Sequence, residues 1–485
     1  MTLANGTGTP PQAVGELRGD GPADGFWDFA RPAGGPVAGL AEFRRWFTRQ
    51  GRIHRYAVDR VPFSALSGWR FEAGSGDLVH ESGGFFAISG LRVRTDFRRP
   101  REWTQPVIVQ PEIGLLGILV KRFDGVPHLL MQSKMEPGNV NTLQLSPTVQ
   151  ATRSNYTGVH RGRRVPYVEY FMGPRRGTVL ADSLQSEQGW WFLHKRNRNM
   201  VVETRDEVPL LDGFQWLTLP QLGELLTSDN LVNMDSRTVL STLPCPEPAA
   251  ELVESVADPY RRAALRSLSP RYGSVHALHE VLRRLTDARA RHELVQRRVP
   301  LRDVLDEGPW RLTETGIARP DGRHFEVIGV DVRAERREVG RWSQPLVAPV
   351  GGLSGLFVKR IDGVLHLLLE ARVEAGALNV CEYAPSVQCS PSHLGTGGRP
   401  ALLDRLLSAP PERIRYDTAL SEEGGRFHHA VTRNLIVETD DDFPLAEPEG
   451  HCWVTLHQAQ ALLRHSNYLN VQARTLVACL TLGLF

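Results

Sequence analysis

The sequence contains one long segment twice in tandem. Residues 117–150 match residues 355–388 without a gap, GILVKRFDGVPHLLMQSKMEPGNVNTLQLSPTVQ against GLFVKRIDGVLHLLLEARVEAGALNVCEYAPSVQ. Further along the chain, SEQGWWFLHKRNRNMVVE matches SEEGGRFHHAVTRNLIVE. Because a match of this length does not arise by chance, the fold must be built from two related units.

The domain organisation follows from the duplication. A chain of 485 residues is too long for a single hydrophobic core. We expect a first repeat over residues 26–244 and a second repeat over residues 276–485. Between them, residues 245–275 read as a proline-bounded linker that carries a helix. Residues 1–25 are rich in Gly, Pro and Thr, and we expect them to be disordered.

Composition excludes several classes of protein. The net charge is +2 and no basic block is present, which argues against nucleic-acid binding. No apolar run of about 18 residues occurs, so we expect neither a signal peptide nor a membrane span, and a cytoplasmic location. The 5 cysteines are odd in number and widely spaced, which argues against a disulfide framework or a CxxC zinc site.

Local patterns within one repeat predict an α+β unit, a mixed sheet flanked by helices. Apolar residues recur at helical spacing over residues 41–58. Two short apolar runs flank Asp124-Gly125, which is a strong signal for a β-hairpin. Residues 192–203 are a further strand candidate. The repeat ends in two helices, the first beginning near Thr218 and the second with Asp235 as a candidate N-cap.

The loop after the hairpin, residues 134–157, is unusually rich in amides and hydroxyls. Such groups both donate and accept hydrogen bonds, and they suit sugar hydroxyls and the edge of a nucleobase. The residues of this loop that we assign to substrate binding are Asn141, Gln144, Arg153 and Tyr156. The alternative is a long loop whose side chains satisfy its own backbone.

A second polar segment, residues 186–199, combines an acid, a histidine and several cations. On a strand, His194, Arg196 and Arg198 would share one face. Cations beside a histidine suit a diphosphate cradle with a general acid or base close by. The alternative is a solvated edge strand blunted by charge.

The two copies differ at several of these positions. Lys195 and Arg196 become Ala430 and Val431, and the second copy also lacks the arginine and tyrosine of residues 153 and 156. We therefore expect the first copy to be the active one and the second to be a worn or auxiliary site.

The strings EPGNVNTLQLSPTVQATRSNYTG and FLHKRNRNMVVE, within two tandem copies, resemble the NDP-hexose 2,3-dehydratases of deoxysugar biosynthesis. The resemblance covers nearly the whole chain after residue 25. It implies tandem Nudix-like domains, a homodimer and no organic cofactor. It also implies removal of the C2 hydroxyl of dTDP-4-keto-6-deoxy-D-glucose, giving a 3,4-diketo-2,6-dideoxy sugar that a 3-ketoreductase consumes.

The same resemblance suggests roles for the polar residues, with no metal ligand among them. We expect His194 to act as acid or base, with Glu187 as its partner. Expected near the diphosphate or the enolate are Lys195, Arg196, Arg198 and Arg153. Tyr156 and Tyr170 are expected to stack on the thymine or to donate to the keto oxygen, and Asn199 to bind substrate.

Two other functions stay open. One is a non-catalytic protein that binds nucleotide sugars. The other is a Nudix hydrolase, which the absence of an REx2ExE metal-binding helix argues against.

Overall fold

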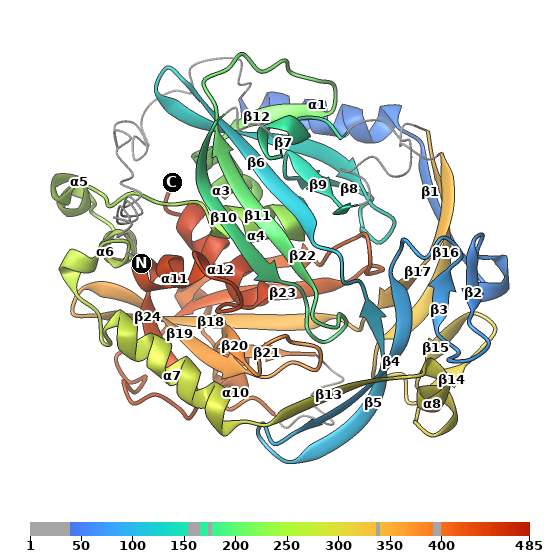
Figure 1. The fold of residues 1–485 in the computed structure, drawn as a ribbon. Coiled ribbons are helices and arrows are strands. Elements are labelled where there is room, and N and C mark those ends of the chain that lie inside the picture. The colour runs from blue at the N-terminus through green and yellow to red at the C-terminus, as the bar shows by residue number, and fades with distance from the viewer. Residues whose placement is uncertain (1–38, 154–164, 173–176, 336–339, 391–398) are drawn as a thin grey trace, which may run out of the picture.

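The computed structural model describes residues 39–153, 165–172, 177–335, 340–390 and 399–485. Within these ranges, two large mixed sheets and two small antiparallel sheets, one of each per repeat, make up the β-structure. Figure 1 shows the small sheets gathered at one side of the molecule and the large sheets above and below its centre. The predicted α+β architecture with a duplicated unit is confirmed.

The first large sheet has the strand order β10-β11-β6-β7-β12, with β8 paired to β7 and β9 to β6. Its strands are β6 (Gly114–Phe123), β7 (Val126–Met135), β8 (Leu143–Ser146), β9 (Val149–Ala151), β10 (Thr178–Ser186), β11 (Arg196–Glu203) and β12 (Phe214–Thr218). Strand β11 runs parallel to β6, whereas the other neighbours are antiparallel. The predicted hairpin is present, because Asp124 and Gly125 adopt φ of 49° and 82° in its turn.

The second large sheet repeats this arrangement in the order β20-β19-β18-β23-β22. Its strands are β18 (Gly352–Ile361), β19 (Val364–Arg372), β20 (Glu382–Pro385), β21 (Val387–Cys389), β22 (Ile414–Ser421), β23 (Val431–Glu438) and β24 (His451–Thr455). Strand β23 runs parallel to β18, as β11 does to β6. The two repeats therefore share one topology.

The repeats exchange their first strands. Strand β1 (Tyr56–Val61) of the first repeat pairs with β16 (Glu326–Ala334) of the second. Reciprocally, β13 (Leu294–Val299) of the second repeat pairs with β4 (Ala87–Thr95) of the first. The other strands of the small sheets are β2 (Trp69–Phe71), β3 (Leu78–His80), β5 (Arg101–Val109), β14 (Arg311–Leu312), β15 (Gly316–Ala318) and β17 (Arg341–Ala348). Each small sheet thus contains strands from both repeats.

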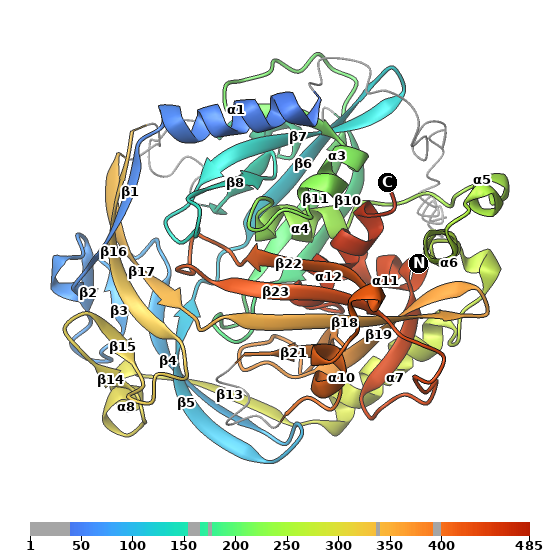
Figure 2. The same ribbon diagram turned by 180° about the vertical axis from the view of Figure 1, so that it is seen from behind.

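Helices cover the large sheets and join the repeats (Figure 2). They are α1 (Leu40–Ile53), α3 (Leu219–Leu225), α4 (Met234–Ser241), α5 (Ala250–Ser255), α6 (Pro259–Ser267), α7 (Leu278–Arg291), α8 (Leu301–Asp306), α10 (Leu403–Leu407), α11 (Leu456–Leu463) and α12 (Val471–Leu482). The helix expected over residues 41–58 is shorter than predicted, because it ends at Ile53 and the chain continues as β1. None of the helices in the described ranges is long and apolar enough to span a membrane.

Helices α4 and α12 meet at the centre of the molecule, between the two large sheets. The Nε of Arg474 donates to Thr238 Oγ1 over 2.7 Å, and Arg237 Nη2 donates to the backbone oxygen of Ser421 over 2.6 Å. Both guanidinium groups are buried. Cys479 of the second repeat packs in the apolar cluster of the first. The two repeats therefore share one interior.

The N-terminus of α4 differs from the prediction. Asn233 is the N-cap, because its side chain accepts a hydrogen bond of 2.8 Å from the backbone of Ser236. Asp235 lies instead in the first turn of the helix, where it is buried. Its carboxylate is therefore not used for capping.

Candidate functional site

Two close backbone contacts join the repeats where the polar loops lie. Gly138 donates its N–H to the carbonyl oxygen of Gly424 over 2.7 Å, and its own carbonyl accepts from His429 N over 2.7 Å. The equivalent bonds on the other side of the molecule join Gly376 to Gly189 and to His194. The polar loop of each repeat therefore faces the Ser-Glu-x-Gly segment of the other, and two composite sites result.

The first composite site combines the loop and helix α4 of the first repeat with the Ser-Glu-x-Gly segment of the second. Its members are Lys134, Glu136, Gln150, Asn233, Asp235, Glu423 and Arg426. A row of hydrogen bonds orders its first-repeat side. Asn233 Nδ2 donates to Gln150 Oε1 over 3.1 Å, and Gln150 Nε2 donates to Glu136 Oε1 over 2.8 Å.

Three carboxylates of this site each bury an oxygen that has no hydrogen-bond partner among the described residues. They are Glu136 Oε2, Asp235 Oδ1 and Glu423 Oε2. Burial of an unpaired carboxylate disfavours its charged form. Burial, with repulsion from Glu136 and Glu187, raises the pKa of Glu423 to about 7 despite the opposing charge of Arg426. Burial and the charge of Glu423 hold the pKa of Asp235 well above its usual value.

Arg426 supplies a guanidinium whose charge acts on Glu423 and Glu136. Its Nε donates to Gln110 Oε1 over 3.1 Å, and its guanidinium lies 4.2 Å from the centre of the Phe86 ring. Burial lowers the pKa of Arg426, while the carboxylates of Glu423 and Glu136 act in the opposite direction. A cation so held can stabilise negative charge that develops beside it.

The second composite site has the same plan with the repeats reversed. Its members are Arg372, Glu374, Glu382, Gln388, Asn470 and Gln472 of the second repeat, with Glu187, Gln188 and Lys195 of the first. Gln388 Nε2 donates to Glu374 Oε1 over 2.8 Å, as in the first site. The other oxygen of Glu374 accepts from Gly189 N over 3.0 Å. Glu374 therefore has both oxygens satisfied, unlike Glu136.

A small pocket opens in the second composite site, and Glu187, Lys195 and Glu374 are among its lining residues. The sites differ in their titratable groups. In the match between the copies, Gln472 stands where the first site has Asp235, and Gln188 stands where it has Glu423. A side-chain amide acts neither as an acid nor as a base near neutral pH. The two acids of raised pKa thus have no counterpart in the second site.

Comparison with known proteins identifies the family. A family model described as NDP-hexose 2,3-dehydratase matches twice, over residues 40–243 and 278–480. The chain belongs to the NDP-hexose 2,3-dehydratase family. The two matches reproduce the internal duplication.

Named relatives extend this likeness over almost the whole chain. A dTDP-4-dehydro-6-deoxy-alpha-D-glucopyranose 2,3-dehydratase of Saccharopolyspora spinosa is 50% identical over 461 residues, 94% of each chain. Proteins of the same name from Streptomyces violaceoruber and Amycolatopsis orientalis are 48% and 46% identical. They cover 91% and 90% of this chain, which spans 97% and 89% of theirs.

Two of the sequence-predicted residues of this dehydratase lie together. The backbone N–H of Glu187 donates to the carbonyl oxygen of Lys195 over 3.0 Å, and both side chains are buried in the second composite site. Burial raises the pKa of Glu187 and lowers that of Lys195, while the charge of each partner opposes the shift. The charge of Glu187 also raises the pKa of Asp235 and Glu423, so the two sites interact electrostatically.

His194 does not join this cluster. It precedes β11 with a φ of 53°, its side chain is exposed, and its Nε2 lies 2.8 Å from Gln296 Oε1. The predicted shared face of His194, Arg196 and Arg198 is not formed, because the strand begins only at Arg196. Strand β11 is also not an edge strand, since β10 and β6 flank it.

Arg198 forms a bidentate ion pair on the surface. Its Nε and Nη2 lie 2.7 and 2.6 Å from the carboxylate oxygens of Asp182. Arg433 and Asp417 repeat the pair in the second copy at 2.8 and 2.6 Å. Retention of the whole pair in both copies indicates a role in the fold.

The remaining predicted residues are scattered. Gln144 is buried and donates to Ser421 Oγ over 2.7 Å and to Asn141 Oδ1 over 2.9 Å, which joins the loop to the second repeat. Asn199 is buried, and neither atom of its amide is hydrogen-bonded among the described residues. Tyr170 lies in an apolar core cluster.

The last two predicted residues of the polar loop are Arg153 and Tyr156. Arg153 is exposed, and Tyr156 lies outside the described residues. Sequence reasoning did not select Asp235, Glu423 or Arg426. The sequence does hold a signal for the two acids. Where one copy has Asp235 or Glu423, the other has Gln472 or Gln188, so an acid stands opposite an amide that cannot carry a proton.

Proposed function

We propose that this protein removes the C2 hydroxyl of dTDP-4-keto-6-deoxy-D-glucose and produces a 3,4-diketo-2,6-dideoxy sugar nucleotide. Its family and the names of its relatives support this reaction. The single observation that carries the assignment to the first composite site is the pair Asp235 and Glu423, two acids of raised pKa whose equivalents in the second site are Gln472 and Gln188.

The reaction needs one group that takes a proton and one that gives a proton. The C4 ketone acidifies the C3 proton, and Glu423, whose pKa is raised to about 7, is poised to accept it near neutral pH. The C2 hydroxyl then leaves as water with a proton from Asp235. Burial and the charge of Glu423 raise the pKa of Asp235, which favours the protonated carboxyl that this step needs.

Electrons and atoms balance without a redox step. Removal of the C3 proton forms an enolate at C4, whose oxygen Arg426 and Lys134 stabilise. The enolate collapses to restore the C4 ketone, the C2–O bond breaks and a C2–C3 double bond forms. The resulting C3 enol tautomerises to a ketone, and the net change is loss of one water.

Glu187 and Lys195 act on this pair through space. Glu187 raises the pKa of both proposed proton carriers, and the charge of Glu423 raises that of Lys195. We propose that they tune the acids from the second composite site. That site has Gln472 and Gln188 in place of Asp235 and Glu423, and we propose that it is auxiliary.

Three further features of the family extend this proposal. The mixed sheet with a central parallel pair and flanking helices supports a Nudix-like architecture. We also propose a homodimer. The diketone product calls for reduction at C3, so we place a 3-ketoreductase directly after this enzyme.

Incubation with dTDP-4-keto-6-deoxyglucose, NADPH and a 3-ketoreductase tests the function. We expect mass spectrometry to show a dTDP-2,6-dideoxy sugar that does not form without this protein. Unchanged substrate bound to the protein indicates a binding protein instead. Release of dTMP in the presence of magnesium indicates a hydrolase, and either result contradicts the proposal.

The pH dependence of kcat/KM reports on the proposed base. We expect kcat/KM to rise with pH and to reach half its plateau near pH 7, because Glu423 must be ionised and its pKa is raised to about 7. Glu382 of the second site has its pKa raised to about 7 as well, through burial. The variant Glu382→Gln should keep the rising limb. If the rising limb disappears in Glu382→Gln, the limb reports on Glu382 of the second composite site, and the assignment of the base to Glu423 is contradicted.

Substitution of His194 tests whether the histidine takes part. Because its side chain is exposed and bonded to Gln296, we expect His194→Ala to retain kcat within about twofold, as for most surface changes. Steady-state kinetics on the purified variant measure this. A loss of a hundredfold places the proton transfer at His194.

A further inference from the structure

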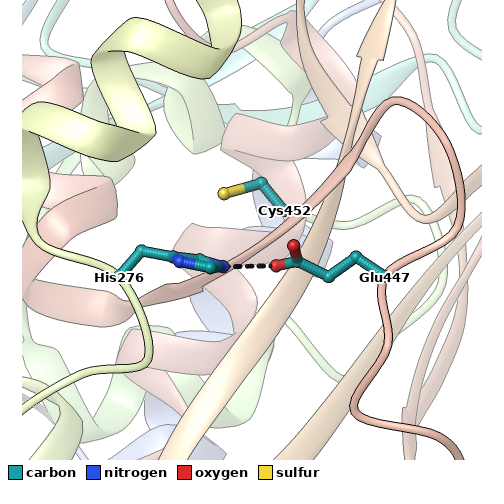
Figure 3. Close-up of side chains that lie close together, drawn as sticks. All are labelled: His276, Glu447 and Cys452. Carbon is teal, nitrogen blue, oxygen red and sulfur yellow. Dashed lines mark hydrogen bonds and ion pairs between the residues drawn. The ribbon is translucent and has the colours of Figure 1, made fainter.

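We propose that His276, Glu447 and Cys452 bind one zinc ion on the second repeat. Figure 3 shows the three side chains converging from separate segments. His276 lies just before α7, Glu447 lies in the loop before β24, and Cys452 is on β24 itself. Their potential ligand atoms all lie within 4.8 Å of one another. None of the three belongs to a composite site.

The ligand types match zinc. A thiolate, an imidazole nitrogen and a carboxylate oxygen form a mixed set that Zn²⁺ accepts in tetrahedral geometry. The Cys452 side chain is 1% exposed, and its Sγ makes a long 3.8 Å contact with the carbonyl oxygen of Trp453 and interacts with the Tyr383 hydroxyl. Burial raises the pKa of this thiol to about 12. Zinc would therefore have to displace the thiol proton when it binds.

Charged groups lie beside two of the ligands. His276 Nε2 lies 2.7 Å from Glu447 Oε1, while its Nδ1 lies 4.0 Å from Glu280 Oε2. The second oxygen of Glu447 accepts from Arg284 over 2.7 Å. A carboxylate behind a histidine and a cation behind a carboxylate are the outer partners that metal ligands commonly have.

Zinc would replace the proton shared by His276 and Glu447. The Trp453 N–H donates to the same oxygen, Glu447 Oε1, over 2.7 Å. A carboxylate oxygen has two lone pairs, so it can accept this bond and coordinate the ion as well. With three protein ligands, a water molecule completes the tetrahedron.

The position of the site indicates a structural role. Helix α7 follows His276 and leads into β13, the strand that crosses to the small sheet of the first repeat. A metal bond from His276 to β24 would fix the start of this connection to the second large sheet. The first repeat has Leu210 and Gln215 where the second has Glu447 and Cys452. We therefore expect one zinc ion per chain.

Metal titration of the full-length protein tests the site. After chelator treatment, we expect one equivalent of Zn²⁺ to bind and to raise the unfolding temperature. Co²⁺ should give the near-ultraviolet absorption of a thiolate–cobalt bond. Sub-stoichiometric binding, or Co²⁺ absorption without the thiolate band, overturns the proposal.

Three variants assign the ligands. Cys452→Ser should lose the thiolate band, and His276→Ala should weaken Zn²⁺ binding by about tenfold or more. Cys245→Ser, a half-buried thiol on the linker, is the matched control and should bind as the wild type does. If Cys452→Ser fails to fold, His276→Ala decides the question. Unchanged zinc affinity in that folded variant contradicts the site.

Discussion

Asp235→Asn and Glu423→Gln are each expected to lower kcat by about 10²–10⁴-fold. Both substitutions keep the shape and polarity of the side chain and remove its ability to carry a proton. Each of the two carboxylates buries an oxygen without a partner among the described residues. Replacing either one by an amide therefore removes few hydrogen bonds. The loss should therefore appear in kcat, with KM and the unfolding temperature nearly unchanged.

A matched substitution in the second composite site controls for the loss of a buried acid. Glu382 is buried, its pKa is raised to about 7, and Ser186 Oγ donates to it over 2.6 Å. The first repeat has Gln144 at the equivalent position. Glu382→Gln thus introduces the other copy's own residue, and kcat should stay within about threefold of wild type, since Asp235 and Glu423, the two proposed proton carriers, are both kept. Equal losses in both sites contradict the assignment.

The reciprocal exchange asks how much the two acids alone contribute. The second site contains Gln472 and Gln188 where the first contains Asp235 and Glu423. Gln472→Asp with Gln188→Glu copies the acids, but Trp191 still stands where the first site has Arg426. We expect no rescue of an Asp235→Asn enzyme, because the second site lacks a guanidinium at the position of Arg426.

Local features of the fold were predictable because they depend on neighbouring residues. Asp124 and Gly125 formed the expected turn, since both tolerate positive φ. The helix expected to begin near Thr218 does so as α3, with a capping box between Thr218 and Gln221. The cap of α4 was placed two residues too late, because Asn233 and Asp235 both suit an N-cap.

Long-range pairing was not predictable from the duplication. The first strand of either copy fits either small sheet by pattern, so the sequence does not reveal that β1 joins β16 and β13 joins β4. The same ambiguity affects the site. Glu187 and the loop around Gln144 come from one repeat, yet the structure places them in different composite sites.

Each composite site combines segments of both copies, so the residues of one copy are divided between the two sites. Each site takes its loop from one copy and its Ser-Glu-x-Gly segment from the other. The loop of the first copy is paired with Glu423, which belongs to the second. The first copy therefore supplies the fuller loop, and the second supplies one of the two proposed proton carriers.

Gly138→Ala is expected to lower the free energy of unfolding by about 3 kcal/mol and to abolish most of the activity. A Cβ at this position would lie 1.7 Å from the carbonyl oxygen of Phe427 and 2.8 Å from that of Gly424. Backbone atoms cannot yield as a flexible side chain can. The loop would have to withdraw, and the hydrogen bonds that Gly138 makes to Gly424 and His429 would be lost.

Two further glycines separate the effect on stability from the effect on catalysis. Gly376→Ala meets the carbonyl oxygen of Phe192 at 2.0 Å in the second composite site, whereas a Cβ on Gly74 meets nothing within 4 Å. We expect urea unfolding to show a similar loss for Gly376→Ala and no loss for Gly74→Ala. At temperatures where each variant is folded, only Gly138→Ala should lack turnover, because it alone separates Glu136 and Asp235 from Glu423. Equal turnover in the folded Gly138 and Gly376 variants would show that the first composite site is not where dehydration occurs.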